Sequence, residues 1–313
     1  KEVGEKGYTE ATAVLTRVTD GNILAMASCG SQMNLAVLSF QPGSIMKIIT
    51  AAVAFERKTA DENTVYDCTG SVKVGDEERS CMNGEVHGKI TIAEAFAESC
   101  NCCFYDLAQK LTYTDENGAT RSYVLDKAKE WGFGEYGAPS KNRFALEYDD
   151  YYSFVCSDIF NEMDLFNCAI GQGKIQASPY LINKITAAIA AGGKCTEAHI
   201  VNDIKDAAGN SVQFKKAETF DLNLSSDSVA LLQNSMQETG ISGTASYEDF
   251  SFCGGIAGKT GTAENIEGEN AHAWFTGYFP ANEPRYAVTV LIPHGGGGYR
   301  AVALAKEVAE EVY

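Results

Sequence analysis

Alternating apolar and polar positions predict a β-hairpin near each end of the chain. Near the start, residues 13–18 and 23–27 flank Thr19-Asp20-Gly21-Asn22, where Asp-Gly and Asn favour the backbone of a tight turn. Near the end, residues 273–279 and 286–292 flank a short segment with a proline at each end. Both ends of the chain therefore contribute strands.

Between these hairpins the periodicity is mostly helical. Apolar or helix-forming residues recur at helical spacing in four central segments and in one near the C-terminus: residues 48–55, 92–111, 123–131, 181–191 and 302–312. Strands at both ends with helices between them predict an α/β protein of the α+β kind. Its antiparallel sheet of about five strands would come from residues 8–40 and 245–313. Helices would flank this sheet, and residues 45–240 would form an inserted, mostly helical subdomain of one domain, residues 1–313.

Composition and charge narrow the class of protein. The chain has 313 residues, 45% hydrophobic and 21% charged, which is ordinary for a globular protein. A net charge of -17 opposes binding to nucleic acid, so we expect no nucleic-acid partner. No stretch approaches the roughly 20 apolar residues that span a bilayer. We therefore expect a soluble chain, with any membrane anchoring through a segment absent from it.

The ten cysteines are scattered and do not resemble a small disulfide scaffold. Cys68 and Cys81 flank a segment with hairpin-like alternation around Gly75-Asp76, so a disulfide between them is possible and stays open. Cys/His spacing does not match a zinc site, because His87 stands alone after Cys81. We predict no metal and no cofactor. The thiol of Cys100 has two interpretations, a reactive group or a small buried apolar one.

Ser44 and Lys47 form the first candidate for catalytic chemistry. Ser44 follows Pro42-Gly43 at the start of an apolar helix, and Lys47 lies one turn further on the same side. The N-terminus of a helix favours the negative charge that develops when a serine oxygen attacks a carbonyl. Burial would disfavour the charged form of the lysine, which could then accept the serine proton. The alternative is an ordinary helix start with a surface lysine.

Two further motifs carry polar groups. Lys259-Thr260-Gly261-Thr262 precedes the C-terminal strands and is expected on an edge strand, where a lysine and two hydroxyls can receive a carboxylate. Ser99-Cys100-Asn101 lies between two amphipathic runs, which predicts a helix junction. A second Ser-x-Asn, Ser140-Lys141-Asn142, lies in a loop after Pro139, and spacing alone leaves it open.

Ser-x-x-Lys, Ser-x-Asn and Lys-Thr-Gly in this order resemble the signature of penicillin-binding proteins and serine β-lactamases. The resemblance to the penicillin-binding transpeptidase domain extends along nearly the whole chain and rests on blocks in the family's order: residues 21–28, Gln41-Pro42-Gly43-Ser44, His87-Gly88, residues 169–173, Gly243-Thr244-Ala245, residues 258–264 and His272-Ala273-Trp274-Phe275. It favours Ser99 over Ser140, because Ser99 follows the His-Gly block. It also implies a β-lactamase/transpeptidase-like fold.

The resemblance implies a role for each matched residue. Ser44 would be acylated by the D-Ala-D-Ala end of a peptidoglycan stem peptide, with Lys47 as its base. Ser99 would relay a proton to the departing D-Ala, and Asn101 would hydrogen-bond Lys47 or the substrate amide. The terminal carboxylate would bind at residues 259–262, through Lys259, Thr260 and Thr262 beside the small Gly261. The backbone N–H groups of Ser44 and Thr262 would form the oxyanion hole.

The implied function is serine D,D-transpeptidation. A second stem peptide would accept the acyl group, and β-lactam antibiotics, penicillin among them, would bind covalently. The site would work on the extracytoplasmic face of a bacterial cell membrane. A D,D-carboxypeptidase shares the acyl-enzyme and stays open.

Two other classes are less consistent with the sequence. A class A β-lactamase needs a water-activating glutamate, and the segment from Glu162 to Asn167 is one residue too long for that pattern. It is interpreted as helix or loop. A class D enzyme usually has Val where this chain has Asn101. A penicillin-sensing receptor domain, which binds without turnover, most resembles class D enzymes.

Overall fold

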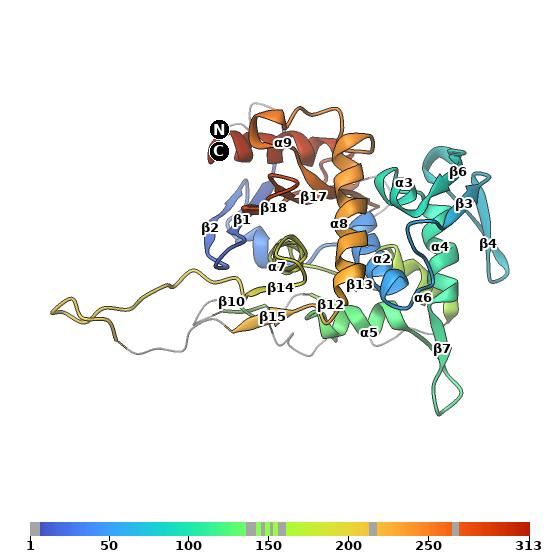
Figure 1. The fold of residues 1–313 in the computed structure, drawn as a ribbon, viewed down its shortest axis with the longest axis horizontal. Helices are drawn as coiled ribbons and strands as arrows, with labels where there is room; N and C mark the ends of the chain where they lie inside the picture. The colour runs from blue at the N-terminus through green and yellow to red at the C-terminus, as the bar shows by residue number, and fades with distance from the viewer. Residues whose placement is uncertain are drawn as a thin grey trace.

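The five-stranded sheet at the centre of the molecule is built from both chain ends (Figure 1). The computed structural model describes residues 7–135, 142–144, 148–150, 153–155, 161–212, 218–264 and 269–313. All neighbouring strands of the sheet are antiparallel, in the order β16 (Ala257–Ala263), β17 (His272–Phe279), β18 (Tyr286–Ile292), β1 (Ala11–Arg17) and β2 (Ile23–Cys29). The predicted fold class is confirmed.

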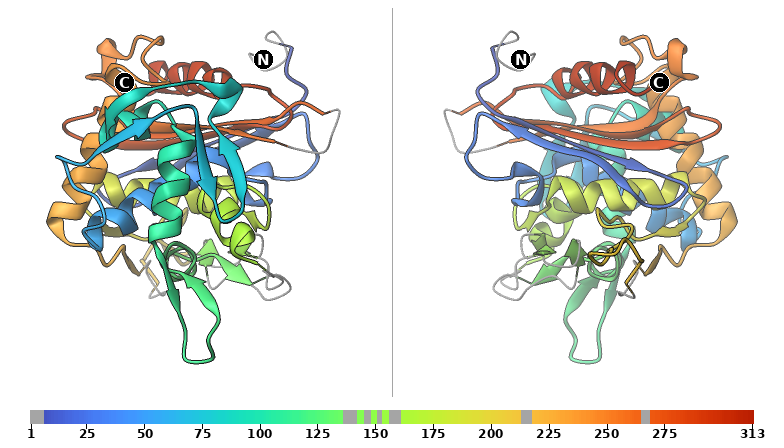
Figure 2. Two further views of the ribbon diagram at one scale, coloured as in Figure 1. Left: turned by 90° about the vertical axis from the view of Figure 1, so that its right-hand side faces the viewer. Right: turned by 90° about the vertical axis from the view of Figure 1, so that its left-hand side faces the viewer.

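Burial along the sheet follows from what covers it. Every residue of β17 is buried, because α9 (Tyr299–Glu310) packs on one face of the central strands and α7 (Pro179–Ala190) on the other. Figure 2 shows α9, in red, on one side of the sheet and α7, in yellow-green, on the opposite side. The edge strand β2 is largely exposed. Strands covered on both faces need apolar residues at successive positions, as β18 has.

The helical part contains the predicted helices, with two differences. Residues 92–111 form two helices separated by a turn, and α8, which the periodicity did not reveal, packs against α2, α3 and β16. Small polar residues occupy several buried positions of α8, including Ser228, Ser235 and Thr239, and this weakens the apolar pattern. The helices are α2 (Lys47–Glu56), α3 (Ile92–Ala97), α4 (Asn101–Lys110), α5 (Tyr123–Glu130), α6 (Glu162–Ala169) and α8 (Ser226–Ile241).

The middle of the chain also contains small sheets that the sequence pattern did not predict. An exception is the hairpin around Gly75-Asp76, which forms as β4 (Ser71–Val74) and β5 (Glu77–Ser80). Strands of two to four residues are too short to show a period of two. The others are β3 (Val65–Cys68) with β6 (Gly88–Thr91), β7 (Thr112–Thr114) with β8 (Thr120–Ser122), β10 (Asn142–Phe144) with β11 (Tyr148–Asp150), β14 (Lys194–Thr196) with β15 (Thr219–Asp221), and β9 (Gly134–Glu135), β12 (Phe154–Val155) and β13 (Ile175–Gln176).

Four short 3₁₀ turns complete the described elements: η1 (Leu35–Val37), η2 (Gly43–Met46), η3 (Met82–Gly84) and η4 (Ser251–Cys253). Within the described part of the chain, none of the helices is both long enough and apolar enough to cross a bilayer.

Candidate active site

Ser44 lies in the 3₁₀ turn η2, which continues directly into α2. We expected the first turn of an α-helix; the turn is tighter, and the backbone N–H of Lys47 bonds to the carbonyl of Ser44. The Trp274 indole N–H donates to the Gln41 carbonyl at 2.9 Å, and the Gly43 N–H donates to the Gly171 carbonyl at 2.9 Å. These bonds fix the segment that carries Ser44 between the sheet and the loop after α6.

Gly43 allows this segment to approach β16 closely. Its φ is +53°, and a Cβ at this position would lie 2.8 Å from the Thr262 carbonyl oxygen. Residues other than Gly rarely adopt this conformation, and the close contact leaves no room for a side chain. Gly43 therefore places the Ser44 turn directly beside the strand that carries the Lys-Thr-Gly motif.

Lys47 is completely buried and makes three hydrogen bonds to the Ser-x-Asn motif. Its Nζ donates to the Ser99 carbonyl at 2.7 Å, to Asn101 Oδ1 at 2.6 Å and to Ser99 Oγ at 3.1 Å. Burial lowers the pKa of Lys47 to about 8, because desolvation disfavours the charged amine. A substantial fraction of this amine is therefore neutral slightly above neutral pH.

The Ser99 motif occupies the break between α3 and α4, as predicted. Ser99 has a φ of +57°, a conformation that is uncommon for residues other than Gly. The Ser99 N–H bonds to the Phe96 carbonyl at 3.1 Å, and the Cys100 N–H bonds to the Ala95 carbonyl at 2.9 Å. The left-handed residue directs both the Ser99 carbonyl and the Asn101 side chain to Lys47. Strained conformations of this kind persist only where their surroundings hold them.

Lys259 and Thr260 lie on β16, which is an edge strand, as expected. Lys259 is completely buried, and its Nζ donates to the Thr260 carbonyl at 3.2 Å. Burial lowers the pKa of Lys259 well below its usual value, and the positive charge of Lys47 lowers it further. Two buried amines thus lie close enough to repel each other, which favours a site that binds an anion.

Thr244 links β16 to the helical side of the site. The hydroxyls of Thr244 and Thr260 share a hydrogen bond of 2.6 Å, and Thr244 Oγ1 donates to the Ala97 carbonyl at 3.1 Å. Ala97 ends α3, two residues before Ser99. Thr244 was recognised only as part of a family block and was not predicted as a site residue. On the far end of the motif, Thr262 Oγ1 accepts a hydrogen bond from the Gly298 N–H at 3.2 Å.

The segments with the predicted site residues therefore converge on one region. Direct contacts join Lys47 to Ser99 and Asn101, and packing joins η2 to β16. The alternative Ser-x-Asn cannot be compared, since Ser140 and Lys141 lie outside the described residues. Glu162, considered as the glutamate of a β-lactamase, accepts a hydrogen bond from Thr120 at the exposed start of α6.

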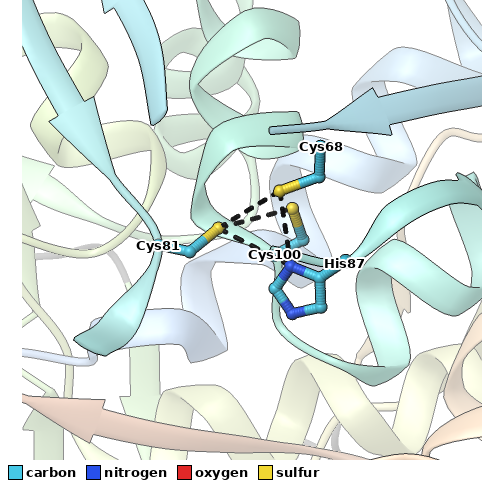
Figure 3. A group of neighbouring side chains, drawn as sticks. All are labelled: Cys68, Cys81, His87 and Cys100. Carbon is cyan, nitrogen blue, oxygen red and sulfur yellow. Dashed lines mark hydrogen bonds between the residues drawn. The ribbon is translucent and has the colours of Figure 1, made fainter. Parts of the chain in front are cut away.

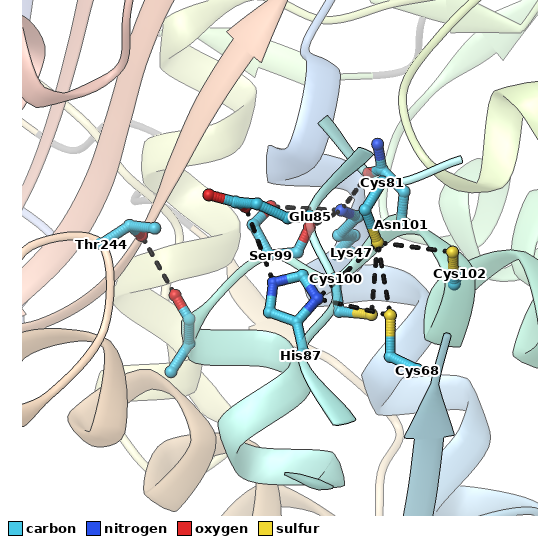
Figure 4. Close-up of polar contacts among 11 residues, drawn as sticks. Lys47, Cys68, Cys81, Glu85, His87, Ser99, Cys100, Asn101, Cys102 and Thr244 are labelled. Carbon is cyan, nitrogen blue, oxygen red and sulfur yellow. Dashed lines mark hydrogen bonds and ion pairs between the residues drawn. The ribbon is translucent and has the colours of Figure 1, made fainter. Parts of the chain in front are cut away.

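The structure also gathers residues that the sequence analysis did not group together. Cys68, Cys81 and His87 surround Cys100, the middle residue of the Ser-x-Asn motif (Figure 4). The thiols of Cys68 and Cys81 are free, and their sulfur atoms lie 3.7 Å apart. In Figure 4 this cluster lies against the turn that holds Lys47. In the sequence, His87 belongs to the His-Gly block, and its spacing from Cys81 does not match a zinc motif.

Solved structures define the class of fold first. The D,D-transpeptidase domain of a peptidoglycan glycosyltransferase from Eggerthella lenta superimposes with a TM-score of 0.81 at 22% identity, covering 98% of this chain and 79% of that one. Penicillin-binding protein A from M. tuberculosis, as a ceftriaxone acyl-enzyme complex, gives a TM-score of 0.80 at 22% identity, covering 96% and 73%. This chain has the fold of penicillin-binding transpeptidase domains.

Sequence comparison then gives the family. Residues 11–313 match the family described as "Penicillin binding protein transpeptidase domain", and the chain belongs to this family. It is 27% identical to peptidoglycan D,D-transpeptidase PbpA of Mycolicibacterium smegmatis over 82% of this chain and 50% of that protein. It is 26% identical to stage V sporulation protein D of Bacillus subtilis over 84% and 40%. The chain thus spans about half or less of the length of these relatives.

Proposed function

We propose that this chain is a serine D,D-transpeptidase domain that cross-links peptidoglycan stem peptides and binds penicillin covalently. The observation that carries the proposal is the buried Lys47, held by Ser99 and Asn101 one turn from Ser44. A desolvated amine beside a serine on a turn is the arrangement that a serine acyltransferase requires. Relatives that are named peptidoglycan D,D-transpeptidases support the same reaction.

The hydrogen bonds of Lys47 indicate how it would act as a base. A neutral amine has two N–H donors and one lone pair. Both donors remain satisfied by the Ser99 carbonyl and Asn101 Oδ1, the two shortest contacts, and the lone pair is left for a hydroxyl proton. In the proposal this proton comes from Ser44.

Acylation would transfer the stem peptide from its terminal D-Ala to Ser44. Ser44 Oγ attacks the carbonyl of the penultimate D-Ala, the amide bond to the terminal D-Ala breaks, and an ester to Ser44 forms. The proton taken by Lys47 passes through the Ser99 hydroxyl, 3.1 Å away, to the departing amine. An amine of a second stem peptide then attacks the ester carbonyl. An amide bond forms, the ester bond to Ser44 breaks, and a proton of the amine passes to Ser44 Oγ. A β-lactam would form the same ester by opening its ring.

The strand β16 would bind the substrate. A bound carboxylate would favour the charged form of Lys259, and the Thr262 hydroxyl would donate to that carboxylate, beside Thr260 and Gly261. Because Thr262 Oγ1 accepts from the Gly298 N–H, its own hydrogen can donate to the carboxylate. The outer side of an edge strand offers backbone groups outside the ladder, which suits the Thr262 N–H as one donor of the oxyanion hole. The Ser44 N–H, on the neighbouring turn η2, would be the other donor.

The location follows from the proposed substrate. Peptidoglycan is a wall polymer, so the domain would work on the extracytoplasmic face of a bacterial cell membrane. The match covers 50% of the length of one relative and 40% of the other, and a region outside the match would supply any membrane anchor.

The test is intact-protein mass spectrometry after incubation with a fluorescent penicillin. We expect one long-lived adduct on the native chain and on Ser246→Ala, a change at an exposed serine, and no adduct on Ser44→Ala. Rapid release of hydrolysed drug would instead indicate a β-lactamase. An adduct on Ser44→Ala would exclude the proposed nucleophile.

A second assay separates transpeptidation from trimming. The native chain is incubated with a stem pentapeptide and an amine acceptor, and the products are separated by mass. We expect a product in which the acceptor has replaced the terminal D-Ala. Release of D-Ala without acceptor transfer would identify a carboxypeptidase.

A further inference from the structure

We propose that Cys68, Cys81, His87 and Cys100 bind one Zn²⁺ ion, which fixes the turn that holds Lys47. Figure 3 shows the four side chains pointing toward one another. Their ligand atoms, three sulfurs and one imidazole nitrogen, all lie within 4.8 Å of one another. Metal binding at this cluster does not depend on the proposed function, whereas its effect on acylation does.

Four of the six ligand separations fit a tetrahedral zinc site. Zn–S bonds of about 2.3 Å and Zn–N bonds of about 2.0 Å imply ligand separations of roughly 3.5–3.8 Å at tetrahedral angles. Cys81 Sγ lies 3.7 Å from Cys68 Sγ, 3.6 Å from Cys100 Sγ and 3.8 Å from His87 Nδ1, and Cys68 Sγ lies 3.4 Å from the same nitrogen. A disulfide would instead need sulfurs about 2.0 Å apart.

The chemistry and burial of the ligands point to a closed, structural zinc site. Thiolates and imidazole select zinc over magnesium or calcium, and four protein ligands leave no open position for catalysis. Cys68 and Cys100 are fully buried, Cys81 is 3% exposed, and the His87 side chain is 11% exposed. Glu85 Oε2 lies 3.8 Å from His87 Nε2, on the ring side away from the sulfurs. This is beyond hydrogen-bond distance, and a small movement of the exposed Glu85 side chain would bring it to the position from which a carboxylate orients a metal-bound histidine.

The segment that supplies three of the ligands has little apolar core of its own. Cys68 ends β3, Cys81 follows β5, and His87 precedes β6. Between residues 65 and 91 the buried positions are Cys68, Gly70, Val74 and Cys81. Small units that cannot bury enough apolar surface commonly depend on a metal or a disulfide. A zinc ion would supply this stabilisation.

The fourth ligand connects this segment to the active site. Cys100 lies between Ser99, which has the left-handed backbone, and Asn101, whose Oδ1 accepts from Lys47. A Zn–S bond at Cys100 fixes the backbone on which both neighbours depend. The zinc is therefore inferred to be a positioning group: it touches neither the substrate nor Ser44, and it acts through the turn.

The first experiment measures zinc content. The native chain is kept reduced, equilibrated with Zn²⁺ and desalted, and its zinc content is measured by elemental mass spectrometry. We expect about one zinc per chain, and less than one tenth of this in Cys68→Ser and His87→Gln. Cys103→Ala is the matched control, a buried cysteine on α4 outside the group, and it should retain zinc. Ser44→Ala should also retain zinc, whatever its effect on penicillin binding.

Spectroscopy identifies the ligands in the folded native chain and does not rely on variants that fail to fold. Replacement of zinc by Co²⁺ should give the intense visible bands of a tetrahedral thiolate site. If the native chain retains no zinc, or if thiol counting finds Cys68 and Cys81 joined in a disulfide in the folded, active chain, the proposal is overturned.

The positioning role is tested by removing the metal. Chelation of zinc from the native chain should slow acylation by fluorescent penicillin by roughly tenfold or more, since small misplacements of catalytic groups are costly. Added Zn²⁺ should restore the rate, and added Mg²⁺ should not. An unchanged rate in the folded, zinc-free chain would exclude the positioning role while leaving the proposed transpeptidase intact. If the native chain binds zinc but is not acylated by penicillin at all, only the proposed function is refuted.

Discussion

The two sides of the candidate active site are held in different ways. Residues 259–262 belong to β16, which pairs along its whole length with β17 in the central sheet. Residues 99–101 form a short turn with one left-handed residue, supported by Lys47 on one side and by the cysteine cluster on the other. Backbone pairing positions the strand side, whereas side chains position the turn. The turn should therefore be the more sensitive of the two.

The largest effect is expected from the base on the turn side. Lys47→Arg keeps the charge but cannot provide a neutral amine, so the second-order rate of acylation by penicillin should fall about 10²–10⁴-fold. The rate is measured with fluorescent penicillin under initial-rate conditions. Lys89→Arg, at an exposed position on β6, is the control and should acylate normally. A Lys47→Arg variant with the native rate would show that another group is the base.

The close approach of the two sides can be broken at Gly43. An alanine at this position must adopt a positive φ, which lowers stability by about 1–2 kcal/mol. Its side chain also displaces the Thr262 carbonyl, which lowers stability by about 1–3 kcal/mol more. Gly75→Ala is a matched control, because Gly75 has a φ of +59° and nothing within 4 Å of the added carbon. Thermal unfolding should show a larger loss of stability for Gly43→Ala, and its acylation rate should fall. Equal losses in the two variants would contradict the close contact with β16.

The pH dependence of acylation tests the burial of Lys47. Burial lowers the pKa of this amine to about 8, so the fraction of neutral amine increases as the pH rises. Deprotonation is nearly complete once the pH is well above the pKa. Acylation should therefore increase about tenfold per pH unit below 8 and then level off. Rates across this range provide the measurement. A plateau already reached at pH 6 would be inconsistent with this base.

The smallest effect is expected at the link between the two sides. Thr244→Val removes the hydroxyl that joins Thr260 to the Ala97 carbonyl, a net loss of about 1 kcal/mol or roughly fivefold in rate. Thr114→Val, at an exposed position on β7, is the control. If Thr244→Val were as damaging as Lys47→Arg, the strand side would be no better fixed than the turn.

The sequence predicted the strand side of the site more completely than the turn side. The two terminal hairpins, the edge position of Lys259 and the helix start near Ser44 follow from local patterns, because alternation and apolar periodicity are properties of neighbouring residues. The break at Ser99 was also predicted from two amphipathic runs. The 3₁₀ form of the Ser44 turn and the helix α8 were not, since hydrogen bonding within a turn and buried small polar residues leave weak periodic signals.

By itself, the sequence determined the sheet with its chain-end strands, the three motifs and the family that these motifs resemble. Only the tertiary structure decided which groups meet. Lys47 contacts Ser99 and Asn101 more than fifty residues further along the chain, and Cys68, Cys81 and His87 surround Cys100. These contacts depend on how helices and short strands pack, and local periodicity carries no information about such distances.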